Sequence, residues 1–334
     1  MDPRVDEITA EPPTSPSYRE GVSLWVWDGQ GRFGFPRIGV EAVGRTWTSS
    51  RRAAFCMAMP GGRLLLVSGD RPSHPVADAA GRPRVLGAGP LRFECIEPFR
   101  HWRLAFDGPV VSLHVEEHLQ GSVARVDLGD GHDIVPVGLR LDAHAAAPPW
   151  FQGSLEPEGH FVAGEDRFEQ LCTVTGEVDV AGTVTPFSGG ALRVHRKGGN
   201  RNDYGDFRGH SWQSAHFPSG RAFGYIHYRP RPDGSVTYRE GWLRDGGEVL
   251  PARVEGTPWM IDTRPSGEDV SFTLRTAKGT ARIDGEIFVS SLRPPRLAGD
   301  GTSFPLLQSG IARYRWDGEE AYGMIERSSR LEPE

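Results

Sequence analysis

Cysteine is scarce in this sequence, and long apolar segments are missing. The 3 cysteines, Cys56, Cys95 and Cys172, lie far apart, and no pair has the spacing of metal ligands. We therefore expect neither a disulfide framework nor a structural zinc site, and three reduced thiols fit a cytoplasmic protein. No apolar run approaches the ~20 residues of a membrane-spanning helix, so we expect no stable membrane insertion.

Basic residues are outnumbered by acidic ones. The 334 residues include 38 Lys and Arg against 44 Asp and Glu, which gives a formal net charge of -6. Because nucleic acid binding needs a basic face for the phosphates, we expect no nucleic acid partner. Phosphate-binding glycine loops and the G-x-S-x-G segment of serine hydrolases are also missing. We expect a small hydrophobic substrate and no cofactor, and the oligomeric state is not indicated.

One segment, "HVEEH", offers a candidate metal site. On a strand, His114, Glu116 and His118 would share one face. The order differs from that of the zinc proteases, in which Glu directly follows the first His on a helix. A solvated strand end explains these charges better, so we expect no bound metal.

Glycine and proline, in contrast, are abundant. The 43 Gly and 27 Pro interrupt the chain too often for long helices, and "WDGQG", "RPDGS" and "LRDGG" carry the Asp-Gly turn signal. The segments between them are short and strand-like, which predicts an all-β protein of antiparallel strands. An acidic, Pro-rich flexible arm is expected over residues 1–17. An Ala- and Pro-rich break near residues 142–153 predicts two β-barrel or sandwich domains in tandem, over 18–147 and 148–334.

The segment "RGHSWQSAHF" (208–217) is the most unusual strand. Alternation of side chains places on one face Arg208, His210, Trp212, Ser214 and His216. The next two expected strands each carry aromatic and titratable groups on one face: Tyr225 with His227, then Tyr238, Glu240 and Trp242. A ligand pocket in a barrel needs both kinds of group, whereas a core needs no titratable groups. An exposed sheet with aromatic and polar cross-strand pairs is the alternative.

The segment "YGDFRGHSWQ" resembles the G-x-R-x-H-S-W-G motif of the lipocalin-like carotenoid 1,2-hydratase (hydroxyneurosporene synthase) superfamily and its bacterial relatives. The matching positions are Arg208, His210, Ser211 and Trp212. The similarity extends to "FRHWRLAFDGP", to "DRFEQ" with Phe168, Glu169 and Gln170, and to the closing "GIARYRWDGEEAYGMIERS". It implies two lipocalin-like barrels, the second carrying the motif. Two departures are Gly209, where the family usually has Asp, and Gln213, where it usually has Gly.

The resemblance implies catalytic roles for His210 and Trp212, with Tyr238 and Glu240 as the nearest counterpart of a family Tyr-x-Asp pair. We expect a hydratase, dehydratase or double-bond isomerase that acts by acid catalysis on a terpenoid, steroid or other lipid-like substrate. Glu240 is the first choice of proton donor, because an apolar pocket raises the pKa of a carboxyl group, and Asp206 is the second. Substrate binding is expected from Arg208, Ser214, His216, Tyr225, His227 and Trp242. A non-catalytic lipocalin-like binding protein and a pericyclase are the alternatives.

Overall fold

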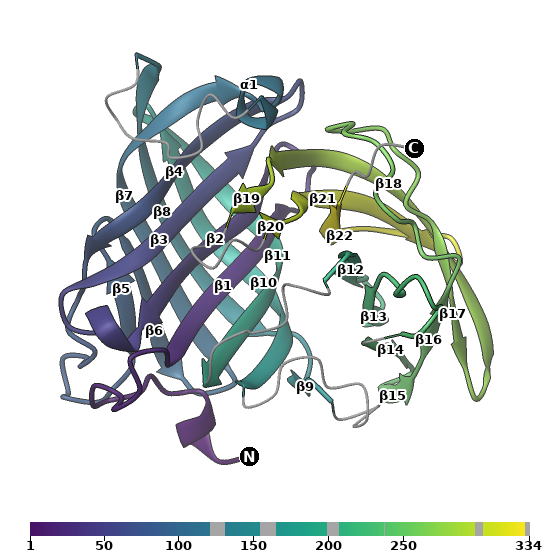
Figure 1. The fold of residues 1–334 in the computed structure, drawn as a ribbon, viewed down its shortest axis with the longest axis horizontal. Helices are drawn as coiled ribbons and strands as arrows, with labels where there is room; N and C mark the ends of the chain where they lie inside the picture. The colour runs from purple at the N-terminus through teal and green to yellow at the C-terminus, as the bar shows by residue number, and fades with distance from the viewer. Residues whose placement is uncertain (121–130, 154–164, 199–206, 237, 298–302, 331–334) are drawn as a thin grey trace.

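The structure is a computed structural model, and it describes residues 1–120, 131–153, 165–198, 207–236, 238–297 and 303–330. The described chain is nearly all strand, arranged as two antiparallel, barrel-like sheets that lie side by side (Figure 1). This arrangement confirms the expected all-β fold with two tandem units. No helix within the described residues is long and apolar enough to cross a membrane.

The first sheet closes into a barrel. Its strands are β1 (Arg19–Asp28), β2 (Gly34–Val43), β3 (Ser50–Ala58), β4 (Arg63–Pro72), β5 (Val85–Ala88), β6 (Leu91–Glu97), β7 (His101–His114), β8 (Asp133–Ala145), β9 (Trp150–Phe151), β10 (Glu165–Val180) and β11 (Thr183–Gly198). The order is β4-β3-β2-β1-β11-β10-β8-β7-β6-β5, and a further pairing of β4 with β7 closes the ring. Inward-facing Phe, Leu and Val side chains fill its interior.

The second sheet carries the His-Ser-Trp segment. It contains β12 (Gly209–His216), β13 (Ala222–Tyr228), β14 (Arg239–Asp245), β15 (Glu248–Pro251), β16 (Arg253–Glu255), β17 (Phe272–Thr276), β18 (Gly279–Arg293), β21 (Leu306–Trp316) and β22 (Glu319–Ser329). The order is β15-β14-β13-β12-β22-β21-β18-β17-β16. One face of this sheet packs into its own apolar core, and the opposite face packs against the outside of the first barrel.

Short elements complete the described chain. They are the 3₁₀ turns η1 (Pro3–Val5) and η2 (Gly44–Thr46), the helix α1 (Val115–Leu119) and the hairpin of β19 (Arg296–Leu297) with β20 (Ser303–Phe304). The start of α1 corrects one expectation. His114 ends β7 and caps α1, while His118 lies within the helix, so the two do not share a strand face.

The change from one sheet to the other lies later than expected. β10 and β11 pair with β8 and β1, so the first barrel extends to Gly198, beyond the break predicted near residues 142–153. The Ala- and Pro-rich segment lies between two strands of the same barrel. Its prolines end β8 and turn the chain back toward β10, without separating two sheets.

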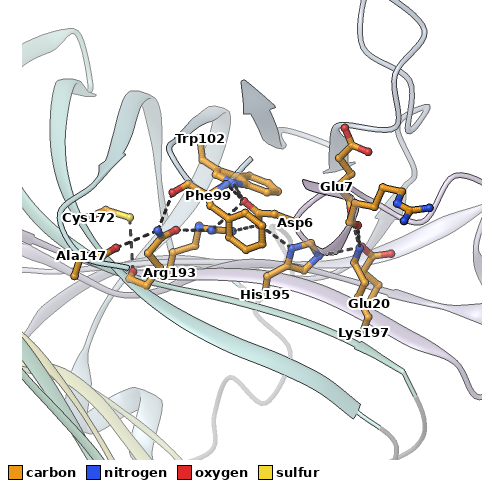
Figure 2. Close-up of polar contacts among 12 residues, drawn as sticks. Asp6, Glu7, Glu20, Phe99, Trp102, Ala147, Cys172, Arg193, His195 and Lys197 are labelled. Carbon is orange, nitrogen blue, oxygen red and sulfur yellow. Dashed lines mark hydrogen bonds and ion pairs between the residues drawn. The ribbon is translucent and has the colours of Figure 1, made fainter. Parts of the chain in front are cut away.

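The expected flexible arm is fixed at its middle. Asp6 is fully buried, and its carboxylate accepts hydrogen bonds from Arg193 Nη1 (2.6 Å) and Trp102 Nε1 (3.0 Å) and contacts His195 Nδ1 (3.3 Å). Figure 2 shows Arg193 and His195 pointing from β11 toward Asp6, with Glu20 on the far side of the imidazole. A buried guanidinium requires a counter-charge, and Asp6 supplies it to Arg193 from outside the sheet.

Candidate functional site

A single row of side chains crosses the second sheet on the face that meets the first barrel. Direct cross-strand partners lie on the same face of a sheet, and the strand register joins, one after another, Glu240, Ile226, Trp212, Glu326, Ser309 and Ser291. His210 and Ser214 flank Trp212 on this face. The row places the motif strand β12 between the two barrels, at the centre of their shared core.

The register separates two groups that the sequence placed together. Tyr225 pairs with Gln213, and His227 pairs with Ser211, so both lie on the face opposite Trp212. The Tyr225 hydroxyl bonds Ser211 Oγ (2.9 Å) inside the second sheet's own core. His227 bonds Thr257 Oγ1 (2.8 Å), and burial lowers its pKa to about 4. Neither side chain contributes to the face between the barrels.

A buried carboxyl group from the first barrel meets the motif tryptophan. Glu169, on the outer face of β10, accepts a hydrogen bond from Trp212 Nε1 at 3.1 Å. Its second oxygen accepts one from Arg167 Nη2 at 2.6 Å, and the Arg167 guanidinium lies 4.8 Å from the Trp212 ring centroid. Burial raises the pKa of Glu169 to about 7, and it outweighs the opposing effects of Arg167 and Trp212. Near neutral pH, this group can therefore both donate and accept a proton.

A second carboxylate, Glu240, lies on the same face two strands away from Trp212. Its Oε2 atom accepts hydrogen bonds from Gly153 N (2.9 Å) and from the Tyr238 hydroxyl. Burial, together with the negative charge of Glu240, raises the pKa of Tyr238 well above its usual range, so the phenol remains a donor. The negative charge of Glu240 also contributes to the raised pKa of Glu169. The two carboxyl groups thus approach the interface from opposite barrels, Glu169 from the first and Glu240 from the second.

Indole groups line this region and leave polar atoms without partners. Trp25 contacts Trp212 edge-to-face with ring centroids 4.8 Å apart, and Trp150 lies 6.3 Å from Trp242. Within the described residues, no hydrogen-bond partner reaches Nε1 of Trp25, Trp150 or Trp242, nor either polar atom of the Gln152 amide. Buried polar atoms are normally hydrogen-bonded. A bound molecule or water between the barrels would supply the missing partners.

His210 belongs to a polar chain on the other side of Trp212. Its Nδ1 atom lies 2.6 Å from Ser328 Oγ, and its Nε2 atom lies 3.4 Å from Glu326 Oε1. Glu326 also accepts a hydrogen bond from Ser309 Oγ at 2.8 Å. Burial alone would raise the pKa of Glu326, but the hydrogen bond and charge of His210 bring it down to about 2. Glu326 is therefore a fixed negative charge, and His210 is held rigidly beside it.

The remaining predicted residues have more peripheral positions. Ser214 shares the face of Trp212, but its hydroxyl donates to Phe223 O at 2.8 Å. Arg208 precedes β12, and His216 ends it, with a pKa lowered by burial. Asp206 lies outside the described residues. No group of three His, Cys, Asp or Glu side chains suited to a metal ion occurs in the described chain.

Three functional candidates were missed in the sequence. Glu169 was recognised only as part of the "DRFEQ" similarity, and Arg167 and Glu326 were not selected. Alternation in "DRFEQL" puts Arg167 and Glu169 on one face, and alternation in "GMIERS" puts Glu326 with Met324 and Ser328. These signals identify charged groups on a strand face, although they do not say that the face is buried between two barrels.

Comparison with known structures places the fold. An AttH-like protein (NE1406) from Nitrosomonas europaea is 15% identical, with a TM-score of 0.59 over 97% of this chain and 98% of that chain. CghA is 12% identical, with a TM-score of 0.56 over 100% and 97% of the two chains. Kievitone hydratase from Nectria haematococca is 11% identical, with a TM-score of 0.50 over 98% and 94%.

These likenesses confirm the fold that the motif implies, two lipocalin-like barrels in tandem. At the level of sequence, the chain belongs to the family described as Domain of unknown function (DUF7064), which matches residues 3–330. No curated protein matches the sequence.

Proposed function

We propose that the protein adds water to, or removes it from, an apolar alkene-type substrate bound between the two barrels, or moves the double bond. The observation that carries this proposal is Glu169, a buried carboxyl group with a pKa raised to about 7 that is hydrogen-bonded to the motif residue Trp212. An acid with such a pKa is protonated often enough at neutral pH to donate to carbon.

Glu169 takes the role of proton donor that we expected of Glu240. In hydration, the Glu169 carboxyl protonates one alkene carbon, and the π electrons form the new C–H bond, leaving a carbocation on the other carbon. Indole faces in the interface stabilise this cation, by ~2 kcal/mol or more each where water is excluded. Water attacks the cation and loses a proton to Glu240, whose Oε2 atom accepts hydrogen bonds in the observed geometry. Dehydration runs the same steps backwards, and isomerisation replaces water attack by transfer of a neighbouring proton to Glu240. Proton exchange with solvent then returns Glu169 to the acid and Glu240 to the carboxylate.

Two structural relatives bear on the choice of reaction. Kievitone hydratase has this fold, which supports water addition. CghA, a pericyclase, also has it and has been crystallised with Sch210972. The second candidate is therefore a pericyclase, in which the tryptophan walls orient an apolar substrate and no carboxyl group transfers a proton.

The test uses incorporation of deuterium from D₂O into carbon, which detects proton transfer before the product is known. A panel of terpenoid, steroid and polyene alkenes and alcohols is incubated with the protein, and products are analysed by mass spectrometry. We expect Glu169→Gln to lower turnover by about 10²–10⁴-fold, the usual contribution of general acid catalysis. The control is Glu177→Gln, at an exposed position on the same strand. Conversion without deuterium incorporation and with full activity in Glu169→Gln would favour a pericyclase, and unchanged substrates would favour a carrier.

A further inference from the structure

A second polar region lies at the other end of the row that contains Trp212. Between β2, β3 and β4 of the first barrel and β18 and β21 of the second sheet, a cleft with a volume of about 80 Å³ is lined by, among others, Arg37, Arg52, Arg293, Cys56, Ser291 and Ser309. Arg52 is exposed at its outer end, while Ser291 and Ser309 are buried. The cleft therefore leads from solvent into the interface between the barrels.

Arg37 is the unusual member of this cleft. Its guanidinium lies 5.7 Å from the Trp25 ring centroid, yet it makes no hydrogen bond or ion pair with any described residue. Burial lowers the pKa of Arg37, and this effect exceeds the opposite influence of Glu326 and Glu41. A guanidinium has five N–H donors, and leaving it unpaired in a partly buried site is unfavourable.

The surroundings of Arg37 are suited to one added negative charge. Three arginines line the cleft, and the two nearby carboxylates already have other partners. Glu41 is engaged by Arg19 (2.9 Å) and Arg196 (2.7 Å). Glu326 is engaged by His210 (3.4 Å) and Ser309 (2.8 Å). Cys56 is the cross-strand partner of Arg37, and burial raises the pKa of its thiol to about 12, so it is neutral. A cleft of about 80 Å³ has room for a carboxylate group, since a single water needs only about 10–15 Å³ on the same measure.

The distance to Trp212 sets the shape of the ligand. Along the row, Ser309 in the cleft is two strands away from Trp212, which at about 4.8 Å per strand is about 10 Å. Trp25 lies between the two regions, because it contacts both the Trp212 ring and the Arg37 guanidinium. Trp25 thus links the unpaired cation to the motif tryptophan, and the buried carboxylate of Glu326 lies beside this connection.

From this geometry we infer that the cleft binds the carboxylate of an elongated apolar acid, with Arg37 as its principal partner. The carboxylate lies about 10 Å, two strand spacings, from the carbon that would react beside Trp212. The binding step stands on the cleft alone, whereas the alignment of the reacting carbon rests on the proposed function. Arg52 at the outer end attracts the anion, and Arg37 holds it in the fork geometry that guanidinium groups offer to carboxylates.

The experiment titrates the full chain with cis-parinaric acid and with its methyl ester at pH 8, followed by the fluorescence of the bound polyene. We expect the acid to bind 10- to 100-fold more tightly than the ester, because one charge-assisted hydrogen bond contributes a binding free energy of that size. Arg37→Gln should remove this preference and leave ester affinity unchanged. Arg37→Lys should restore part of it. Arg140→Gln, at an exposed arginine of the first barrel, is the matched control.

Several results would overturn the inference: no binding of the acid, equal affinities for acid and ester, or a preference that survives Arg37→Gln. A parallel loss of acid and ester binding in Arg37→Gln would likewise show that Arg37 only supports the fold. Acid and ester affinities measured for the Glu169→Gln variant separate the two proposals. If this variant still prefers the acid, but neither it nor the parent protein transfers a proton to carbon, the proposed reaction is wrong and the carboxylate site stands. If turnover depends on Glu169 but no preference exists, the carboxylate site fails alone.

Discussion

The raised pKa of Glu169 predicts how the stability of the protein depends on pH, and this can be measured before any substrate is known. A carboxyl group whose pKa rises from 4.5 to about 7 on folding binds more protons in the native than in the unfolded state between these pH values. The free energy of unfolding therefore falls as the pH rises through this window. At about 1.4 kcal/mol for each pH unit, ionisation of Glu169 lowers the stability of the native protein by about 2–4 kcal/mol at pH 8.

Glu169→Gln removes this pH dependence, because glutamine resembles the protonated acid in shape and never ionises. At pH 5 we expect the variant and the parent protein to differ by about 1 kcal/mol or less, the effect of exchanging one neutral hydrogen-bonding group for another. At pH 8.5 the variant should be the more stable protein, by about 2–4 kcal/mol. Urea denaturation followed by tryptophan fluorescence, at half-unit pH steps, measures the difference. Glu177→Gln serves again as the control on the same strand.

The reasoning is wrong if the difference is constant with pH, or if the variant becomes less stable as the pH rises. The second result would mean that the ion pair with Arg167, at 2.6 Å, outweighs burial and stabilises the ionised carboxylate. Glu169 would then be a structural anion at neutral pH and a poor proton donor, and the proposed mechanism would lose its acid.

Two further predictions concern the frame around the site. Asp6→Asn should lower the free energy of unfolding at pH 7 by about 3–5 kcal/mol in urea denaturation, because Arg193 loses its buried counter-charge and His195 keeps only Glu20 as an acidic partner. Burial alone would raise the pKa of Asp6, but the Arg193 guanidinium and the contact with His195 hold it below its usual range, so this difference should shrink as the pH falls through the native pKa. Gly209→Ala should lower the melting temperature, because Gly209 has φ 130° and an added Cβ would lie 2.2 Å from Ser328 O. Gly220→Ala, with φ 87° but open space around the added atom, measures the conformational effect alone, and an equal loss in both would contradict the steric argument.

The alternation of residues between glycine and proline breaks predicted the strands and one face of the motif strand. This worked because alternation depends on a single strand and not on its neighbours. It placed His210, Trp212 and Ser214 together correctly. It also placed Tyr225 and His227 on one face, but it could not relate that face to the face of Trp212, because the register of β13 against β12 is set by the turn at residues 217–221 and not by either strand. The role of Glu169 depends on how the outer face of one barrel packs on a sheet forty residues later. No pattern in "DRFEQ" carries that information.

The two departures from the carotenoid hydratase motif have a structural explanation that leaves the site intact. Gly209 adopts a backbone conformation with no room for a Cβ atom, so the Asp that the family usually has cannot occupy this position here. Gln213 lies on the face opposite Trp212, where it donates to the Tyr225 hydroxyl (2.7 Å) and accepts from Tyr314 (2.7 Å) in the core of the second sheet.

Neither departure changes the face that carries His210 and Trp212. The missing motif carboxylate has a counterpart in space, because Glu169 brings a carboxyl group to Trp212 from the other barrel. An acid supplied across the interface is positioned by the packing of the two barrels rather than by the motif strand. Under the proposed function, the position of the acid in this protein is therefore set by the packing of the two barrels as well as by the His-Ser-Trp segment.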